Sequence, residues 1–354
     1  MTRWIAYLAA TVLVACANVA PTPIAQDAVA EQAETQSTGL GGWNEAVVTT
    51  ASPDAWISFL TEIAGWEVRQ ESPIDDGLKT LWDLPETATG EEILLSNIGA
   101  ESGFIRLVHL DGVDQDWIRA DARPWDTGGI FNMNVRVVGM DEVREKMLRD
   151  GWHGDSEPIQ YGFGPFEVIE WIARGPDGVR LALIERLAPP LESWPNLKSV
   201  SRAFNSTQTV ADIDAASAFY KDVLGMQTYL EHNGASAEPG PNVLGLTHED
   251  AVSVPRQIYI LHPDGVNEGS VELVSFEGAS GLDLTERAIP KNIGLSVLRF
   301  PVEDLDATIA ALTARGAVFE AEPLSMTLAP YGDIRIAALV SPEGARLEIY
   351  ETVE

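Results

Sequence analysis

The stretch Ala211–Met226, ADIDAASAFYKDVLGM, has the apolar spacing of an amphipathic helix that stops at a glycine. Its apolar residues recur every three or four positions, so they share one face of a helix. Gly225 follows the last of them and is placed to end the helix in the left-handed conformation that glycine adopts easily. The residues on the apolar face are Ile213, Ala216, Tyr220 and Val223. The stretch therefore predicts a short helix that leads directly into a strand.

The same unit recurs three more times in the chain. Each further copy places an apolar helical face before a glycine, at Gly65, Gly151 and Gly316. The four closing glycines lie 74 to 91 residues apart, which is too long for a solenoid repeat and suits a compact module. The three further faces are Trp56, Phe59, Leu60 and Ile63; Met140, Val143 and Met147; and Leu305, Ile309 and Leu312.

Strand patterns flank each predicted helix. Before the second helix, residues 131–137 alternate between apolar and polar side chains, as a half-buried strand does. After the helices, the turn sequences Pro176-Asp177-Gly178, Pro263-Asp264-Gly265 and Pro342-Glu343-Gly344 each precede a β-rich run. The unit therefore reads βαβββ, and the chain is predicted to be an α+β protein of four such modules.

This pattern resembles the vicinal oxygen chelate (VOC) superfamily, which includes glyoxalase I, extradiol dioxygenases and bleomycin resistance proteins. The likeness extends over roughly residues 43–354 and is most specific at 218–226 (AFYKDVLGM) and at the paired endings 175–178 and 341–344. In that family, two modules combine into one curved mixed sheet whose concave face holds a ligand, often under a metal. The resemblance therefore implies two glyoxalase-like domains.

The domain boundaries follow from the modules and from composition. Residues 188–198 lie in a proline-rich stretch and are expected to link two domains, although the order in which the modules pair is left open. We expect a lipoprotein signal peptide over 1–15, a flexible tether over 16–42, a first VOC domain over 43–187, this linker, and a second VOC domain over 199–354.

The N-terminal residues are interpreted separately from the domains. Residues 4–12 form an apolar run that is too short to cross a bilayer as a permanent helix. Leu13–Cys16 (LVAC) resembles a bacterial lipobox, in which cleavage before the cysteine leaves its thiol to carry a lipid. The resemblance implies a membrane-anchored lipoprotein that faces the periplasm, and Ala17 is compatible with the outer membrane. An ordinary secretory signal that happens to contain a cysteine is the alternative.

The net charge and the cysteine count argue against certain classes of function. The chain has 23 Lys and Arg against 54 Asp and Glu, a formal net charge of −31, which argues against binding to nucleic acid. Cys16 is the only cysteine, so the chain cannot form an intrachain disulfide and its site cannot use a thiol. Four modules on one chain can build both cavities without a partner, so a monomer is expected.

The resembled family takes its metal ligands from the first and last strands of each module. None of the corresponding residues here is a histidine, so a two-His metal site is not expected and no cofactor is predicted. The corresponding residues are Glu45 and Arg106, Asn132 and Ala182, Asn205 and Glu272, and Val297 and Glu348.

Two sets of these residues are candidate sites. Glu45 and Arg106 should face each other, either as an ion pair that fills a closed pocket or as a clamp for a carboxylate ligand. Glu272 and Glu348 are the candidate catalytic pair, either as acid and base or as ligands of a divalent cation such as Mg²⁺ or Ca²⁺; both could also be inert. The ligand-binding candidates beside them are Asn132, Asn205, Thr207 and Tyr350.

Three functions remain open from the sequence. The first is a ligand-binding protein of the bleomycin-resistance kind that captures a small molecule without a metal. The second is an isomerase, lyase or hydrolase that uses Glu272 and Glu348. The third is a structural component whose cavities have closed. One scaffold hosts all three, so the fold alone cannot decide between them.

Overall fold

A computed structural model describes residues 37–163, 165–192, 194, 196–279 and 281–353. The predicted signal peptide, the lipidation site at Cys16 and most of the predicted tether lie outside these residues. Within the described residues, no helix is both long enough and apolar enough to span a membrane.

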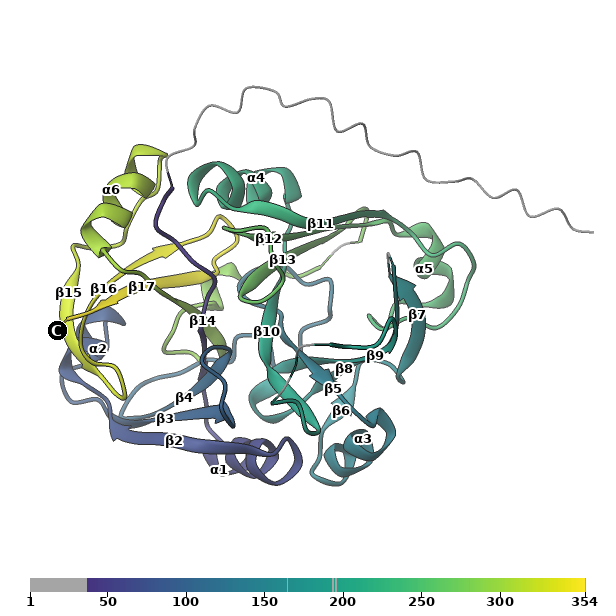
Figure 1. Cartoon of the computed structure of the whole chain (residues 1–354), viewed down its shortest axis with the longest axis horizontal. Helices are drawn as coiled ribbons and strands as arrows, with labels where there is room; N and C mark the ends of the chain where they lie inside the picture. Colours follow the sequence, from purple (N-terminus) through teal and green to yellow (C-terminus); the bar gives the residue numbers. More distant parts are fainter. Residues whose placement is uncertain (1–36, 164, 193, 195, 280, 354) are drawn as a thin grey trace, which may run out of the picture. The chain divides into compact units, whose positions relative to one another are not determined.

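The described strands form two mixed sheets, which confirms the predicted α+β fold (Figure 1). The first sheet has the strand order β15-β16-β17-β14-β1-β4-β3-β2, and the second has the order β11-β12-β13-β10-β5-β9-β8-β6, with β7 paired to β8. The first contains β1 (Glu45–Thr49), β2 (Trp66–Pro73), β3 (Thr89–Asn97), β4 (Phe104–Asp111), β14 (Gly294–Pro301), β15 (Leu324–Leu328), β16 (Gly332–Val340) and β17 (Arg346–Thr352). The second contains β5 (Asn132–Val137), β6 (His153–Gly154), β7 (Ile159–Phe163), β8 (Phe166–Arg174), β9 (Arg180–Ala188), β10 (Val200–Thr209), β11 (Gln227–Gly234), β12 (Arg256–His262) and β13 (Ser270–Phe276).

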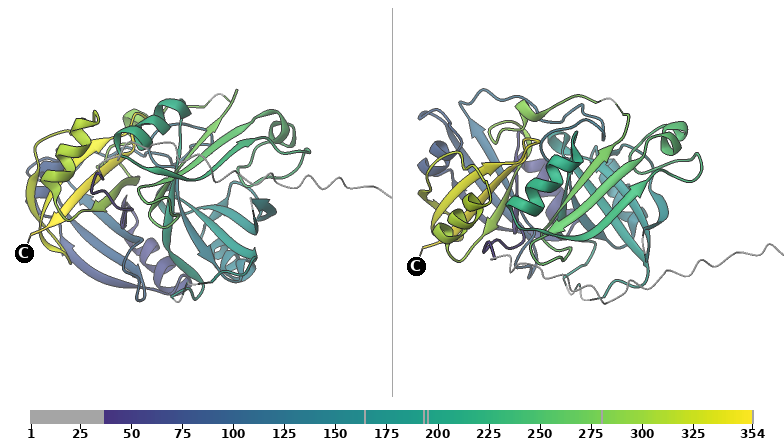
Figure 2. Two further views of the ribbon diagram at one scale, coloured as in Figure 1. Left: turned by 45° about the horizontal axis from the view of Figure 1, so that its top comes forward. Right: turned by 90° about the horizontal axis from the view of Figure 1, so that it is seen from above.

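The modules pair in an order that differs from the predicted domains. Strand β1 of the first module pairs with β14 of the fourth, and β5 of the second pairs with β10 of the third, both antiparallel. In Figure 1 the purple-blue and yellow strands accordingly share one sheet, and the teal and green strands share the other; both views in Figure 2 show the same grouping. The prediction that residues 43–187 and 199–354 form separate domains is therefore wrong.

The connections explain this pairing. The predicted linker 188–198 joins β9 to β10, which both neighbour β5 in the second sheet, so it does not join two sheets. The chain instead passes between the sheets twice, through residues 112–131 and 277–293. These two crossover segments pair with each other through β-bridges between Trp117 and Ile293 and between Thr127 and Asp283.

The four predicted helices all form, and each ends at its predicted glycine. Gly65, Gly151, Gly225 and Gly316 have φ between 74° and 99°, the left-handed region that favours glycine. In the first and third modules the helix closes with a π-helical turn, whereas the second and fourth helices remain α-helical. The helices are α1 (Pro53–Ser58) with π-turn η1 (Phe59–Ile63), α3 (Met140–Arg149), α4 (Ile213–Ala218) with π-turn η3 (Phe219–Val223), and α6 (Leu305–Ala314); α2 (Asp76–Leu81), α5 (His248–Ser253) and the short turns η2 (Pro176–Gly178) and η4 (Thr285–Arg287) lie in connections.

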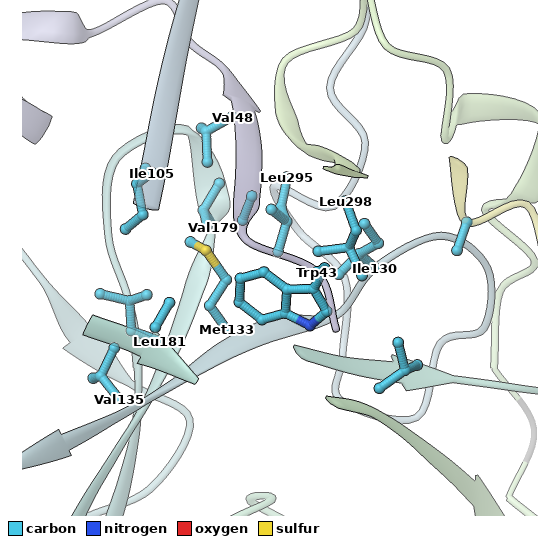
Figure 3. Close-up of a cluster of buried hydrophobic side chains, with 14 of the residues drawn as sticks. Trp43, Val48, Ile105, Ile130, Met133, Val135, Val179, Leu181, Leu295 and Leu298 are labelled. Carbon is cyan, nitrogen blue, oxygen red and sulfur yellow. The ribbon is translucent and has the colours of Figure 1, made fainter. Parts of the chain in front are cut away.

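The two sheets share one hydrophobic core. The indole of Trp43 lies between apolar side chains of the first sheet, such as Leu298, and of the second, such as Met133 (Figure 3). Its Nε1 donates a hydrogen bond to the carbonyl oxygen of Ser270, 2.7 Å away, at the start of β13. Large buried aromatic surfaces of this kind are a major source of folding stability. The back of each sheet is thus committed to packing, which leaves the opposite faces for a site.

The C-terminal end of the predicted tether belongs to the fold. Thr38 and Leu40 are both 7% exposed, and Leu40 joins the main core. The Thr38 hydroxyl donates a hydrogen bond to the carbonyl oxygen of Leu224 over 3.3 Å. The ordered domain therefore begins before residue 43, and the prediction of a flexible tether is wrong for residues 38–40.

Candidate functional site

The inner face of the first sheet carries a buried network of arginines and glutamates. Arg106 donates to both carboxylate oxygens of Glu45, over 2.6 and 2.9 Å. Arg299 donates to Glu45 and to Glu348, over 2.8 Å each. All four side chains are fully buried. Glu45 and Arg106 therefore face each other as predicted, and they do so as an ion pair.

The network keeps two of its carboxylates ionised. Burial alone would raise the pKa of Glu45, but Arg106 and Arg299 outweigh burial and hold the pKa below its usual value. Burial likewise opposes ionisation of Glu348, and Arg299 and Arg346 overcome it. Glu92 differs, because it lies 3.8 Å from Arg106 without a hydrogen bond, and burial raises its pKa.

Helix α2 and the turn between β15 and β16 cover this network. Trp82, directly after α2, donates from Nε1 to Glu348 over 2.7 Å. Arg106 donates to the carbonyl oxygen of Ala329, and the hydroxyl of Tyr331 donates to Glu45. Tyr350 stacks on Tyr331 with ring centroids 5.4 Å apart. Arg106 Nη1 and Arg299 Nη2 have no hydrogen-bond partner among the described residues, but both atoms are buried beneath this cover. This face of the first sheet is therefore a packed polar core.

The predicted pair of Glu272 and Glu348 does not form. Glu272 lies on β13 of the second sheet, whereas Glu348 lies on β17 of the first and is saturated by Trp82 and the network arginines. The two carboxylates therefore cannot share a proton or a cation. The error follows from the module pairing, because the third and fourth modules contribute to different sheets.

The inner face of the second sheet encloses a cavity of about 150 Å³. Strands β5, β8, β9, β10, β12 and β13 supply its floor and walls, and Tyr229 of β11 lies at its solvent-exposed side. Four predicted residues line it together: Asn132, Asn205, Thr207 and Glu272. Its apolar walls include Phe131, Val168, Ile172, Val243, Leu244, Ile258, Ile260 and Val274. The cavity is thus large enough for a small organic molecule.

A row of amides and a hydroxyl crosses the cavity floor. Asn134 donates from Nδ2 to Asn205 Oδ1 over 2.6 Å, and Asn205 donates to the Ser270 hydroxyl over 2.7 Å. Three polar atoms in this row have no hydrogen-bond partner among the described residues, namely Asn132 Oδ1, Asn134 Oδ1 and Thr207 Oγ1. Buried polar atoms are rarely left unpaired, because each costs about 1–3 kcal/mol. The row can therefore accept hydrogen bonds from a bound molecule.

Two glutamates line the cavity together with this row. The hydroxyl of Tyr161 donates a short hydrogen bond to Glu170, whose pKa is raised by burial. Glu272 makes no hydrogen bond or ion pair within the described part of the chain, and burial, with a smaller contribution from Glu170, raises its pKa to about 8. A carboxyl group with this pKa can both donate and accept a proton near neutral pH.

Two arginines lie at one side of the cavity. Arg136, on β5, is 7% exposed and stacks on Phe204 with its guanidinium carbon 4.2 Å from the ring centroid. Arg186, on β9, stacks in the same way on Phe166, at 3.8 Å. Burial and the neighbouring charge of Arg186 lower the pKa of Arg136 to about 10.

The family's metal-ligand positions carry few donors for a divalent cation on either face. In the second sheet, the family's ligand positions hold Asn132, Ala182, Asn205 and Glu272, of which one is a carboxylate and one offers no donor. In the first sheet, Arg106 and Arg299 occupy the centre of the face and oppose a positive ion. Over the residues that the structure describes, no cluster of three His, Cys, Asp or Glu side chains is placed to hold a metal.

Several residues on the inner faces of the two sheets are not among the predicted site residues. Strand alternation could have found Arg136, which shares a face with Asn132 and Asn134, and Arg299, which alternates with Leu298 and Phe300. Nothing in the sequence signals Glu170, because its strand meets the site only through the pairing of β7, β8 and β9.

Comparisons with known proteins agree with this fold. The model of the Glyoxalase/Bleomycin resistance protein/Dioxygenase superfamily matches residues 203–349. That stretch supplies strands to both sheets. No curated protein matches the chain.

Solved structures resemble most of the chain. Glyoxalase I from Zea mays is similar with a TM-score of 0.55 and 16% identity, over 88% of this chain and 92% of that one. A putative dioxygenase from Bacillus subtilis is similar with a TM-score of 0.54 and 11% identity, over 89% of this chain and 86% of that one. At such identities the likeness concerns the fold alone. Residues 203–349 thus match the glyoxalase/bleomycin resistance protein/dioxygenase superfamily, and most of the chain shares the fold of these solved structures.

Proposed function

We propose that this protein binds a small molecule in the cavity of the second sheet. The observation that carries the proposal is the set of unpartnered polar atoms of Asn132, Asn134 and Thr207 on the floor of an apolar-walled cavity. A folded protein keeps such atoms unpaired at a cost, and a ligand that supplies hydrogen-bond donors offsets that cost. The first sheet also keeps unpaired buried atoms, at Glu92, Arg106 and Arg299, but its inner face is filled by its own ion pairs.

Benzyl alcohol is a suitable neutral probe, because a cavity of about 150 Å³ can accommodate benzene. We expect saturation-transfer NMR to detect its binding to the purified protein. Replacing Ile258 on the cavity wall by Trp should fill the space and weaken binding at least tenfold. Val318→Trp is the matched control, because Val318 is 81% exposed and does not line the cavity. Equal binding by both variants would exclude this cavity as the site.

An enzyme is the second candidate, and the raised pKa of Glu272 favours it. In such an enzyme Glu272 would act alone as acid and base, because Glu348 lies in the other sheet. An isomerase or lyase of this kind removes a proton next to a carbonyl group. Deuterium exchange from D₂O into hydroxyacetone, followed by NMR, is expected to be catalysed by the wild type and lost in Glu272→Gln. Exchange at the uncatalysed rate in both proteins would remove this candidate.

We also propose that a lipid on Cys16 anchors the protein to the cell envelope, facing the periplasm, with the outer membrane as the expected location. The support is the resemblance of Leu13–Cys16 to a lipobox. Labelled palmitate should be incorporated into the wild type and not into Cys16→Ser when expressed in a bacterium with two membranes. Release of an unlabelled wild-type protein into the periplasm would favour the ordinary secretory signal. Each sheet is complete within one chain, and we expect the mass of a monomer in light scattering.

A further inference from the structure

Arg136 is a buried cation that no carboxylate contacts directly, although Glu268 and Glu170 lie near enough to favour its charge. Its side chain forms no ion pair or hydrogen bond with another described residue, and its Nε is both buried and unpaired. Other buried arginines also keep one unpaired nitrogen, but each has hydrogen-bonded partners: Arg106 and Arg299 have glutamates, Arg180 has Asp155, and Arg119 has backbone carbonyls. Burying a charge without a hydrogen-bonded counter-ion is costly. The absence of such a counter-ion at Arg136 therefore needs a physical explanation.

Arg186 repeats this arrangement on the neighbouring strand. Its Nε is also buried and unpaired, and its guanidinium stacks on Phe166. Parallel pairing of β5 with β9 sets Arg136 opposite Ile184, so Arg186 projects from the same face two residues further along. Two like charges are thus held side by side, although the chain has 54 acidic residues that could have neutralised them.

The aromatic rings orient these guanidinium groups. Stacking on Phe204 and Phe166 fixes the plane of each group and leaves its N–H edge available for hydrogen bonds. The planar fork of an arginine matches the two oxygens of a carboxylate. Along β5, Asn134 lies two residues from Arg136, a step of about 7 Å on the same face. A molecule of that length can reach from the arginines to the amide row.

We propose that Arg136 and Arg186 bind the carboxylate of the ligand, so that the cavity selects small carboxylic acids with an apolar body. The inference rests on the proposed binding function and adds the chemical class of the ligand. The apolar walls would contact the body of the acid, and the Asn134–Asn205 row would contact its far end.

Benzoate and benzyl alcohol test this proposal, because they share the ring and differ in charge. Dissociation constants from NMR titration should show benzoate binding to the wild type at least tenfold more tightly than benzyl alcohol. Arg136→Gln should remove that advantage and leave the affinity for benzyl alcohol within about twofold. Arg186→Gln should reduce the advantage as well; Arg186 is less buried, so this variant serves if Arg136→Gln does not fold.

Arg69→Gln is the matched control, because Arg69 also stacks on a phenylalanine, Phe104 at 5.0 Å, but lies on the first sheet. It should retain the preference for benzoate. Benzyl alcohol binding without any preference for benzoate would overturn the inference and leave the cavity proposal standing. A preference that survives in both Arg136→Gln and Arg186→Gln would also overturn it. Failure of both probes to bind would refute both proposals.

Discussion

Glutamates at equivalent places in the two sheets have opposite protonation chemistry. Glu348 on β17 and Glu272 on β13 occupy the same position in their modules; Glu348 is fully buried, and Glu272 is partly buried where it lines the cavity. Arginines hold the pKa of Glu348 below its usual value despite burial, whereas Glu272 has no such partner among the described residues and its pKa rises to about 8. The local counter-charge, rather than the position in the module, decides which carboxyl group keeps a proton at neutral pH.

The raised pKa of Glu272 predicts that this residue makes the free energy of unfolding depend on pH. Its folded-state pKa of about 8 lies above the ordinary value of a glutamate, so the folded protein holds a proton that the unfolded chain releases. The free energy of unfolding should therefore fall as the pH rises from 5 to 8, and Glu272→Gln should remove roughly 1–3 kcal/mol of that fall. Urea denaturation at each pH measures it. The exposed Glu277→Gln should keep the wild-type slope; an unchanged slope in Glu272→Gln would contradict the shift.

Strand alternation predicted side-chain directions well. It placed Glu272, Asn205 and Thr207 on one face and put Val271 and Leu273 in the core, as the structure shows. It also set Glu45 against Arg106. Alternation acts within one strand, so it could not reveal that Arg299 of the fourth module joins Glu45 of the first. Contacts between modules depend on which strands pair, and no local pattern encodes that choice.

At the scale of elements, helix α2 distinguishes the closed sheet from the open one. It is inserted between β2 and β3, packs on β15, and leads into Trp82 over the ion network. Asp75 caps the helix by accepting a hydrogen bond from the backbone N–H of Gly77 over 2.7 Å. The connection between β11 and β12 in the second sheet instead carries α5, beside which the cavity remains.

A methyl group at Gly77 should disturb this covering helix. A Cβ there would lie 2.4 Å from Met326 Cβ and 2.8 Å from Asp75 Oδ1, so both the contact with β15 and the cap must shift. We expect Gly77→Ala to lower the free energy of unfolding by about 1–3 kcal/mol, despite the better helix propensity of alanine. Chemical denaturation measures the change. Gly240→Ala is the control, because a Cβ there meets nothing within 4 Å; equal stabilities of the two variants would refute the close contact.

The sequence did not predict which modules pair their strands in one sheet. The four helices, their closing glycines and the βαβββ order were all readable from periodicity and turn residues. The prolines of residues 188–198 predict a domain linker, yet this segment connects β9 and β10, which flank β5 in one sheet. The true crossovers, 112–131 and 277–293, are held by contacts with each other, such as the hydrogen bond from the Asp116 backbone N–H to Asn292. Such distant contacts leave no local signature.

The whole molecule combines a strongly negative charge with ion pairs that water does not reach. The formal net charge of −31 repels itself across the folded surface, which destabilises a compact state. The ions of the first-sheet network, such as Glu45 and Arg106, are fully buried, so dissolved salt screens them little. Salt should therefore reduce the surface repulsion without weakening the interior ion pairs.

Because the repulsive charges are exposed and these ion pairs are buried, we predict that salt stabilises the protein. Between 10 and 150 mM NaCl the Debye length falls from about 30 to about 8 Å, so repulsion between distant surface carboxylates is largely screened. The midpoint of thermal unfolding at pH 7, followed by circular dichroism, should rise by several degrees. Near pH 4.5, where about half of the exposed carboxylates are protonated, the same titration should produce a smaller rise because less charge remains to be screened. A midpoint that falls with salt at pH 7 would mean that exposed ion pairs, rather than net repulsion, dominate the electrostatics, since only attractions that salt can screen would weaken in this way.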